Sequence, residues 1–143
     1  MKVKPYKFIE HTADLGIRVK GKSLKELFNN AALAVFDIIA EKAASFKLQA
    51  SSCRKVIIKQ KADNLEELFI NWLNELLSLS ATKEVIFEDF KIDKLDEHNL
   101  EAIAVGSDME NYKVNTEIKA ATYHELKIVK TPVGWLAEVI LDV

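Results

Sequence analysis

The sequence has few of the residues that dominate disulfide-rich, collagen-like or low-complexity proteins. Its 143 residues include one cysteine, four glycines and two prolines. A lone cysteine, Cys53, excludes an internal disulfide bond and a multi-cysteine zinc site, and we expect it to be a half-buried thiol where a strand begins. No apolar run approaches the roughly 18 residues of a membrane span, and the charged N-terminus lacks the apolar region of a signal peptide. We expect a cytoplasmic protein without a membrane segment.

A surplus of positive charge is also missing. Lysine and arginine number 20 against 22 aspartates and glutamates, which gives a formal net charge of −2. A protein that holds nucleic acid by itself usually carries a basic surplus, because its cations displace counterions from the phosphates. Autonomous binding of RNA or DNA is therefore disfavoured.

The remaining composition is that of an ordinary globular protein. Hydrophobic residues make up 49% and charged residues 29% of the chain, which is close to the average of folded domains. A chain of this length corresponds to about one domain. We therefore expect residues 1–143 to form a single domain with a real hydrophobic core.

Two capping boxes mark the starts of two helices. Ser23 precedes Glu26 and Asn64 precedes Glu67 by three residues each, a spacing at which the capping side chain accepts a hydrogen bond from the glutamate N–H. Apolar residues then recur with the helical period. The pattern predicts helices over about 24–41 and 65–80.

Alternating apolar and polar residues predict the strands. The predicted strands cover 6–11, 15–20, 54–60, 85–95, 100–106, 114–121, 123–130 and 135–141. A turn at 131–134 would close a hairpin, and His98 would lie in a solvated hairpin turn. The expected architecture is α+β, with both helices packed on one face of a mixed β-sheet of about seven strands.

The two helix starts also resemble each other. Residues 24–30 and 65–71 share Leu, Glu, Leu, Phe and Asn at equivalent positions. This agreement indicates a duplicated strand–helix unit. The alternative is that any capped amphipathic helix shows such a pattern.

Two short segments carry unusual polar residues. The segment 11–14 places His11, Thr12 and Asp14 between two strands, where they would form either a turn or a ligand site. At the other end of the chain, Asp142 stands beside the terminal carboxylate of Val143. Adjacent anions repel each other. A hard cation such as Ca²⁺ would relieve that repulsion, whereas the alternative is a frayed, solvated terminus.

Motifs of known catalytic chemistry are missing from the sequence. It contains no phosphate-binding GxxxxGK[ST] loop, no GxGxxG, no GxSxG and no HExxH, and it offers no defensible pair of nucleophile and base. The residues by themselves therefore do not indicate an enzyme.

Three motifs in order resemble the archease family. They are the segment 11–17 (HTADLGI), the segment 23–37 that follows it, and the segment 119–124 (KAATYH) together with the Asp142 ending. The resemblance covers nearly the whole chain. It implies a small α+β domain with an internal duplication. It also implies a non-enzymatic cofactor of an RtcB-type tRNA-splicing ligase, which promotes guanylylation and multiple turnover of the ligase and meets tRNA only through it.

The resemblance also implies site residues. A divalent metal, Ca²⁺, would be bound by Asp14, Asp142 and the carbonyl of Val143. The residues expected to contact the ligase are His11, Lys119, Thr122 and His124.

The loop before Lys119 departs from the family pattern. Many members carry Gly-Glu and later a His there, whereas this chain has Gly106-Ser107 and then Asn111-Tyr112. Asp108 is a candidate to replace the missing acid.

Two other functions remain open. One is a general chaperone or modulator of RNA-processing proteins. The other is a metal-dependent hydrolase built on Asp14, Asp142 and a histidine, since carboxylates and a hard cation can activate water. No general base can be named for such a hydrolase.

Overall fold

The computed structural model describes residues 5–9, 14–43 and 53–143. In these ranges the elements are β1 (Tyr6–Ile9), β2 (Leu15–Gly21), α1 (Leu24–Ile39), β3 (Ala40–Lys42), β4 (Cys53–Lys61), α2 (Leu65–Lys83), β5 (Val85–Leu95), β6 (Asn99–Asp108), a 3₁₀ turn (Met109–Asn111), β7 (Tyr112–Val114), β8 (Ala120–Thr131) and β9 (Gly134–Asp142). Cys53 opens β4 as expected, but its side chain is exposed rather than half-buried.

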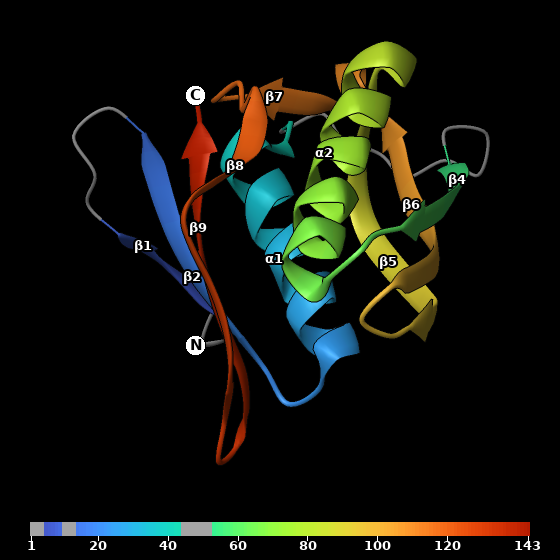
Figure 1. The fold of residues 1–143 in the computed structure, drawn as a ribbon. Helices are drawn as coiled ribbons and strands as arrows, with labels where there is room; N and C mark the ends of the chain where they lie inside the picture. The colour runs from blue at the N-terminus through green and yellow to red at the C-terminus, as the bar shows by residue number, and fades with distance from the viewer. Residues whose placement is uncertain (1–4, 10–13, 44–52) are drawn as a thin grey trace.

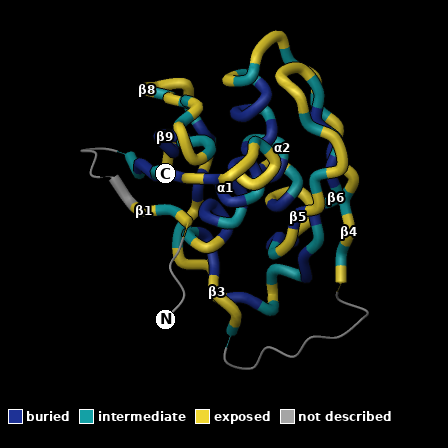
Figure 2. The backbone as a smooth tube through the Cα atoms, turned by 90° about the horizontal axis from the view of Figure 1, so that it is seen from below, coloured by how far each residue is buried: buried dark blue, intermediate teal, exposed yellow. Residues whose placement is uncertain are grey.

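The helices lie between two antiparallel sheets (Figure 1, Figure 2). One sheet has the order β1-β2-β9-β8 and the other has the order β4-β6-β5, while β3 and β7 form a separate pair. The α+β class is confirmed. The expectation of one mixed sheet with both helices on one face is corrected: the described strands form three sheets, and every described pairing is antiparallel.

The apolar surface of α1 explains this arrangement. Its buried residues include Leu27, Phe28, Val35 and Phe36, which lie around more than one side of the helix. A helix that is apolar on opposite sides must be covered on both. Phe36 meets Phe87 of β5 with ring centroids 5.5 Å apart, while β2 covers the other side of the helix. Neither helix of the described chain is long and apolar enough to cross a membrane.

Both predicted helix starts are confirmed. Ser23 Oγ accepts a hydrogen bond from the N–H of Glu26 at 3.2 Å, and Asn64 Oδ1 accepts one from the N–H of Glu67 at 2.8 Å. The first helix ends at Ile39, two residues before the expected end, because the chain continues into β3.

Equivalent residues of the two similar helix starts meet in the core. Phe28 of α1 and Phe69 of α2 occupy the same position in the repeated pattern, and their rings pack edge to face with centroids 5.1 Å apart. One turn along α2, Trp72 donates its indole N–H to the carbonyl of Phe28 at 2.9 Å. This symmetric contact agrees with the predicted duplication of a strand–helix unit.

The predicted strand over 114–121 is wrong. Val114 ends β7, Ala120 and Ala121 already belong to β8, and residues 115–119 between them form no strand. The N–H groups of Asn115 and Thr116 turn away from the sheets and donate to the carbonyl of Ile39, at 2.7 and 3.2 Å. They thereby satisfy the end of α1, and the chain re-enters a sheet at Ala120. The predicted hairpin between β8 and β9 is confirmed.

Candidate functional site

Strand register brings Asp14 and Asp142 to the same end of the first sheet. The last paired residues of β2 and β9 are Leu15 and Leu141. Asp14 precedes Leu15 and Asp142 follows Leu141, so the same register places the two aspartates opposite each other. Side chains alternate along a strand. Leu141 is fully buried against the helices while Asp142 is exposed, so the two aspartates belong to the outer face.

The start of β8 completes this end of the sheet. Ala120 pairs with Asp142, and the N–H of Lys119 donates to the carbonyl of Asp142 at 2.8 Å. The side chain of Lys119 is exposed, and the side chain of Val143 is 42% exposed. Residues from both ends of the chain and one lysine therefore lie at the same end of the sheet, which we call the sheet tip and which comprises Asp14, Lys119, Asp142 and Val143.

Hydrogen bonds to the main chain fix β8 beside the sheet tip. Thr122 Oγ1 donates to the carbonyl of Ile140 at 2.9 Å. On the other side of β8, Asn74 of α2 accepts from the N–H of Ala121 at 2.7 Å and donates to its carbonyl at 3.1 Å. Because β8 is an edge strand, the two bonds of Asn74 satisfy main-chain groups of β8 that would otherwise lack a partner strand. Thr122 thus has a structural role, because its side chain ties β8 to β9.

A wide bulge interrupts β8 directly after Thr122. The register passes from Thr122 opposite Ile140 to Lys127 opposite Glu138, so four residues, 123–126, face a single residue of β9. Glu125 takes a left-handed conformation with φ 53°, which is uncommon outside glycine. Such bulges re-aim side chains.

The bulge carries exposed side chains beside the sheet tip. Tyr123 is 56% exposed, and His124 is exposed with Nε2 4.0 Å from a carboxylate oxygen of Glu125. Partial burial raises the pKa of the Tyr123 hydroxyl, and the charge of Glu67 acts in the same direction. Tyr123 is therefore neutral at physiological pH and presents an aromatic ring with a hydroxyl that can donate.

The possible ligands at the sheet tip are of the type that a hard cation binds. Asp14, Asp142 and the C-terminal carboxylate supply only oxygen ligands, which Ca²⁺ prefers. The residues in the described ranges contain no group of three His, Cys, Asp or Glu side chains that could hold a metal ion. A site here would therefore need main-chain oxygen and water as further ligands, so the Ca²⁺ site stays a prediction.

The other predicted residues divide as follows. His11 lies outside the described residues. Asp108 lies at the end of β6, in the other sheet, and pairs with Arg54 at 3.0 Å, so it does not take the place of an acid at the sheet tip.

Sequence reasoning missed Asn74, although a polar amide beside the buried Leu73 and Leu76 was a usable signal.

Comparisons with known proteins agree on one family. The sequence pattern of the Archease protein family (MTH1598/TM1083) matches residues 6–143. A protein archease of Methanosarcina barkeri is 38% identical over 146 residues, which cover 98% of this chain and 97% of the relative. A protein archease of Pyrococcus abyssi is also 38% identical, over 99% of this chain and all of the relative.

Solved structures share the fold. The solution structure of protein 1598 of Methanobacterium thermoautotrophicum superimposes with a TM-score of 0.72 at 33% identity, covering 99% of this chain and 100% of that one. The crystal structure of a Thermotoga maritima archease, described as a possible chaperone, has a TM-score of 0.66 at 22% identity over 96% of both chains. The present chain belongs to the archease family.

Proposed function

We propose that this archease is a non-enzymatic, cytoplasmic activator of an RtcB-type tRNA-splicing RNA ligase, which it binds to promote guanylylation and multiple turnover. The observation that carries the proposal is the sheet tip. Three strands bring Asp14, Lys119 and Asp142 together from distant parts of the chain. These residues belong to the motifs that resemble the family, and they share one accessible end of the sheet.

The rigidity of β8 supports docking to a folded protein. Asn74 and Thr122 hold its main chain on both sides, while Tyr123 and His124 project from the bulge into solvent. An interface gains most from side chains whose positions are fixed before binding. Exposed aromatic residues are frequent anchors of such interfaces. We therefore assign the ligase contact to Lys119 and His124 together with Tyr123.

The charges of the sheet tip suggest how the tip would act on the ligase. Asp14, Asp142 and the terminal carboxylate of Val143 would hold Ca²⁺ there, and the ion would supply a positive charge that neutralises them. Asp14 then ties the start of β2 to the end of β9, and Lys119 keeps its ammonium group free for the partner. In this proposal the chain's own residues shape and charge the tip, and the reaction takes place on the ligase.

Contact with tRNA would be indirect. The net charge of −2 offers little release of counterions from phosphates. At the sheet tip itself, carboxylates outnumber the single lysine. The ligase would therefore hold the RNA, and the archease would act on the ligase.

The test is a ligation assay with the RtcB-type ligase of the same organism, broken tRNA halves in excess over ligase, GTP and divalent metal. The proposal expects many products per ligase only when the archease is present, and a faster appearance of guanylylated ligase. No change in either quantity would contradict it. Incubation of the archease alone with the same substrates tests the hydrolase alternative, and ligase recovery after heating with and without archease tests the chaperone alternative.

A further inference from the structure

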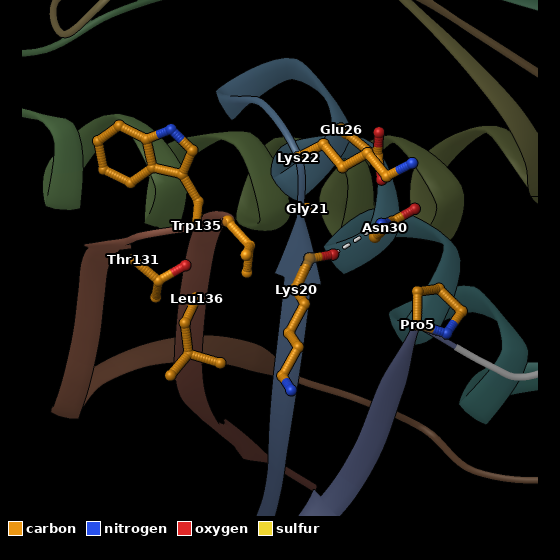
Figure 3. Close-up of a pocket in the computed structure, with 10 residues that line it drawn as sticks. Pro5, Lys20, Gly21, Lys22, Glu26, Asn30, Thr131, Trp135 and Leu136 are labelled. Atoms are coloured by element: carbon orange, nitrogen blue, oxygen red, sulfur yellow. Dashed lines mark hydrogen bonds between the residues drawn. The ribbon is translucent and has the colours of Figure 1, made fainter.

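A groove lies at the opposite end of the first sheet from the sheet tip (Figure 3). It has a volume of about 540 Å³ and is formed where β2 ends, α1 begins and the β8–β9 hairpin turns. Gly21 of β2, which lines the groove, is six positions beyond Leu15. At about 3.3 Å per strand residue, the groove is roughly 20 Å from Asp14. The groove is thus separate from the site of the proposed function.

A side-chain hydrogen bond and a close approach of two main chains fix the walls of the groove. Asn30 of α1 is buried and donates its side-chain N–H to the carbonyl of Lys20 at 2.8 Å, which ties the helix to the end of β2 (Figure 3). Gly134 of the hairpin has φ +148°, and a Cβ there would lie 2.3 Å from the carbonyl oxygen of Gly21. Only glycine permits this approach. The hairpin is therefore held against β2, and the groove is preformed.

The groove combines an apolar wall with a cationic rim. Trp135 and Leu136 are half-buried along it, and Val133 at the tip of the hairpin is 86% exposed. A valine so exposed contributes little to the core. Trp135 and Leu136 follow each other in β9, so their side chains point to opposite faces of the sheet (Figure 3). We define the hairpin wall as Val133 and Trp135.

Three lysines lie at or beside the groove, Lys130 on the sheet face of Trp135 and Lys20 on the opposite face. Lys20 and Lys22 line the groove, and Lys130 holds its Nζ 6.0 Å from the centroid of the Trp135 ring. All three are exposed, and in the described part of the chain none is paired with a carboxylate. Glu26 is the single acidic residue among the described residues that line the groove. This end of the sheet is locally positive on a chain whose net charge is negative.

We propose that the groove docks an acidic peptide segment of a partner protein, with one bulky apolar side chain of the peptide seated on the hairpin wall. Charge complementarity favours an acidic occupant, because within the described residues none of the three lysines is paired with a carboxylate. The exposed aliphatic side chain of Val133 favours a peptide over RNA, because it can neither stack on a base as an aromatic ring does nor bind a phosphate. The alternative occupant is a second copy of the chain, and the test below distinguishes it from a peptide.

The test uses a fluorescein-labelled peptide of about seven residues, with Phe at its centre and Asp or Glu elsewhere. Two control peptides replace Phe by Ser, or every acid by Lys. Binding is followed by fluorescence anisotropy and by the emission of Trp135. The other tryptophan, Trp72, is fully buried with its indole N–H bonded to Phe28, so a change in emission reports on Trp135. We expect saturable binding of the acidic Phe peptide with a blue shift of that emission.

Variants locate the site. Lys22→Glu combined with Lys130→Glu is expected to raise the Kd at least about tenfold. The matched control Lys61→Glu, on the exposed side of β4 in the other sheet, is expected to change it less than about twofold. Val133→Ser removes an apolar group at an exposed turn where folding is not at risk, and we expect a rise of about three- to tenfold.

Several results would overturn the docking proposal. Equal binding by the lysine peptide, or an unchanged Kd in the double lysine variant, would refute the charge argument. Tighter binding of a short RNA than of the peptide, or a dimer in light scattering that Val133→Ser disrupts, would assign the groove to a different occupant. Because both variants lie far from the sheet tip, activation of the ligase tests the proposed function independently.

Discussion

Asn74 of α2 binds both main-chain polar groups of Ala121 in β8. Its Oδ1 accepts from the N–H at 2.7 Å and its Nδ2 donates to the carbonyl at 3.1 Å. One side-chain amide thereby takes the place of a neighbouring strand. Ala121 stands between Lys119 and Tyr123, so this contact couples the buried helix to the surface that we assign to the ligase.

Loss of the Asn74 amide should weaken this attachment. Asn74→Ala removes both hydrogen bonds from partly buried groups, so we expect the free energy of unfolding in urea to fall by about 1–3 kcal/mol. The amide hydrogen of Ala121 should also exchange faster. Asn74→Asp retains an acceptor for the Ala121 N–H and should slow that exchange again. Equal exchange rates in wild type and Asn74→Ala would show that the contact does not hold β8.

Gly106 should not tolerate a side chain. It lies in β6 opposite Phe87, and a Cβ would stand 2.0 Å from the carbonyl oxygen of Ile86 on β5. The neighbour is main chain and cannot move without breaking the pair, so Gly106→Ala should lower stability by about 1–3 kcal/mol. Glu101→Ala, at an outward position of the same strand, is the control and should change it by less than about 0.5 kcal/mol. Similar melting temperatures for the two variants would contradict this packing.

Tyr112 should give the protein a stability that is lost in alkali. Burial raises the pKa of its hydroxyl above the usual 10.0, and a hydrogen bond to Glu88 acts in the same direction. The folded state therefore retains this proton more tightly than the unfolded state. The resulting stability is fully present below pH 10 and declines as the pH rises further.

Tyr112→Phe isolates this effect. The difference in unfolding free energy between wild type and variant should be constant from about pH 7 to 9 and should shrink above about pH 10. Urea titrations at each pH measure it. A difference that grows with pH would mean that the hydroxyl ionises more easily in the folded state.

Calcium binding should depend on Asp142. The carboxylates of the sheet tip are the proposed ligands, so Asp142→Asn should weaken Ca²⁺ binding by about tenfold or more, since one anionic oxygen donor is replaced by a neutral amide. Isothermal titration of protein stripped with EGTA provides the measurement. Asp63→Asn, at an exposed position before α2, is the matched control. Identical binding by wild type and Asp142→Asn would place the metal elsewhere.

Local patterns predicted the local structure. The side chains of Ser23 and Asn64 determine where the helices begin, and the alternation from Val85 to Leu95 reproduces β5 from end to end. These features depend on neighbours in sequence. The predicted strand is wrong over 115–119, where the N–H groups of Asn115 and Thr116 bind the carbonyl of Ile39 at the end of α1. Alternation of apolar and polar residues cannot predict such a contact.

Such local patterns could not predict which strands pair when the strands are far apart in the sequence. The division of the described strands into separate sheets depends on which strands cover which side of α1, and β2 pairs with β9 near the other end of the chain. The meeting of Asp14 with Asp142 was expected only through the family resemblance, and the register now places both at one end of the sheet. Asn74 was missed because its role depends on an edge strand 47 residues away.

The most direct test of the central claim is multiple-turnover ligation by the partner ligase with Asp14→Ala in place of wild type, with circular dichroism confirming the fold. Asp63→Ala is the matched control. We predict that Asp14→Ala folds normally and loses activation by at least about tenfold, while Asp63→Ala activates like wild type, because Asp14, unlike Asp63, contributes its carboxylate to the sheet tip. A folded Asp14→Ala protein that activates the ligase as well as wild type would contradict the account.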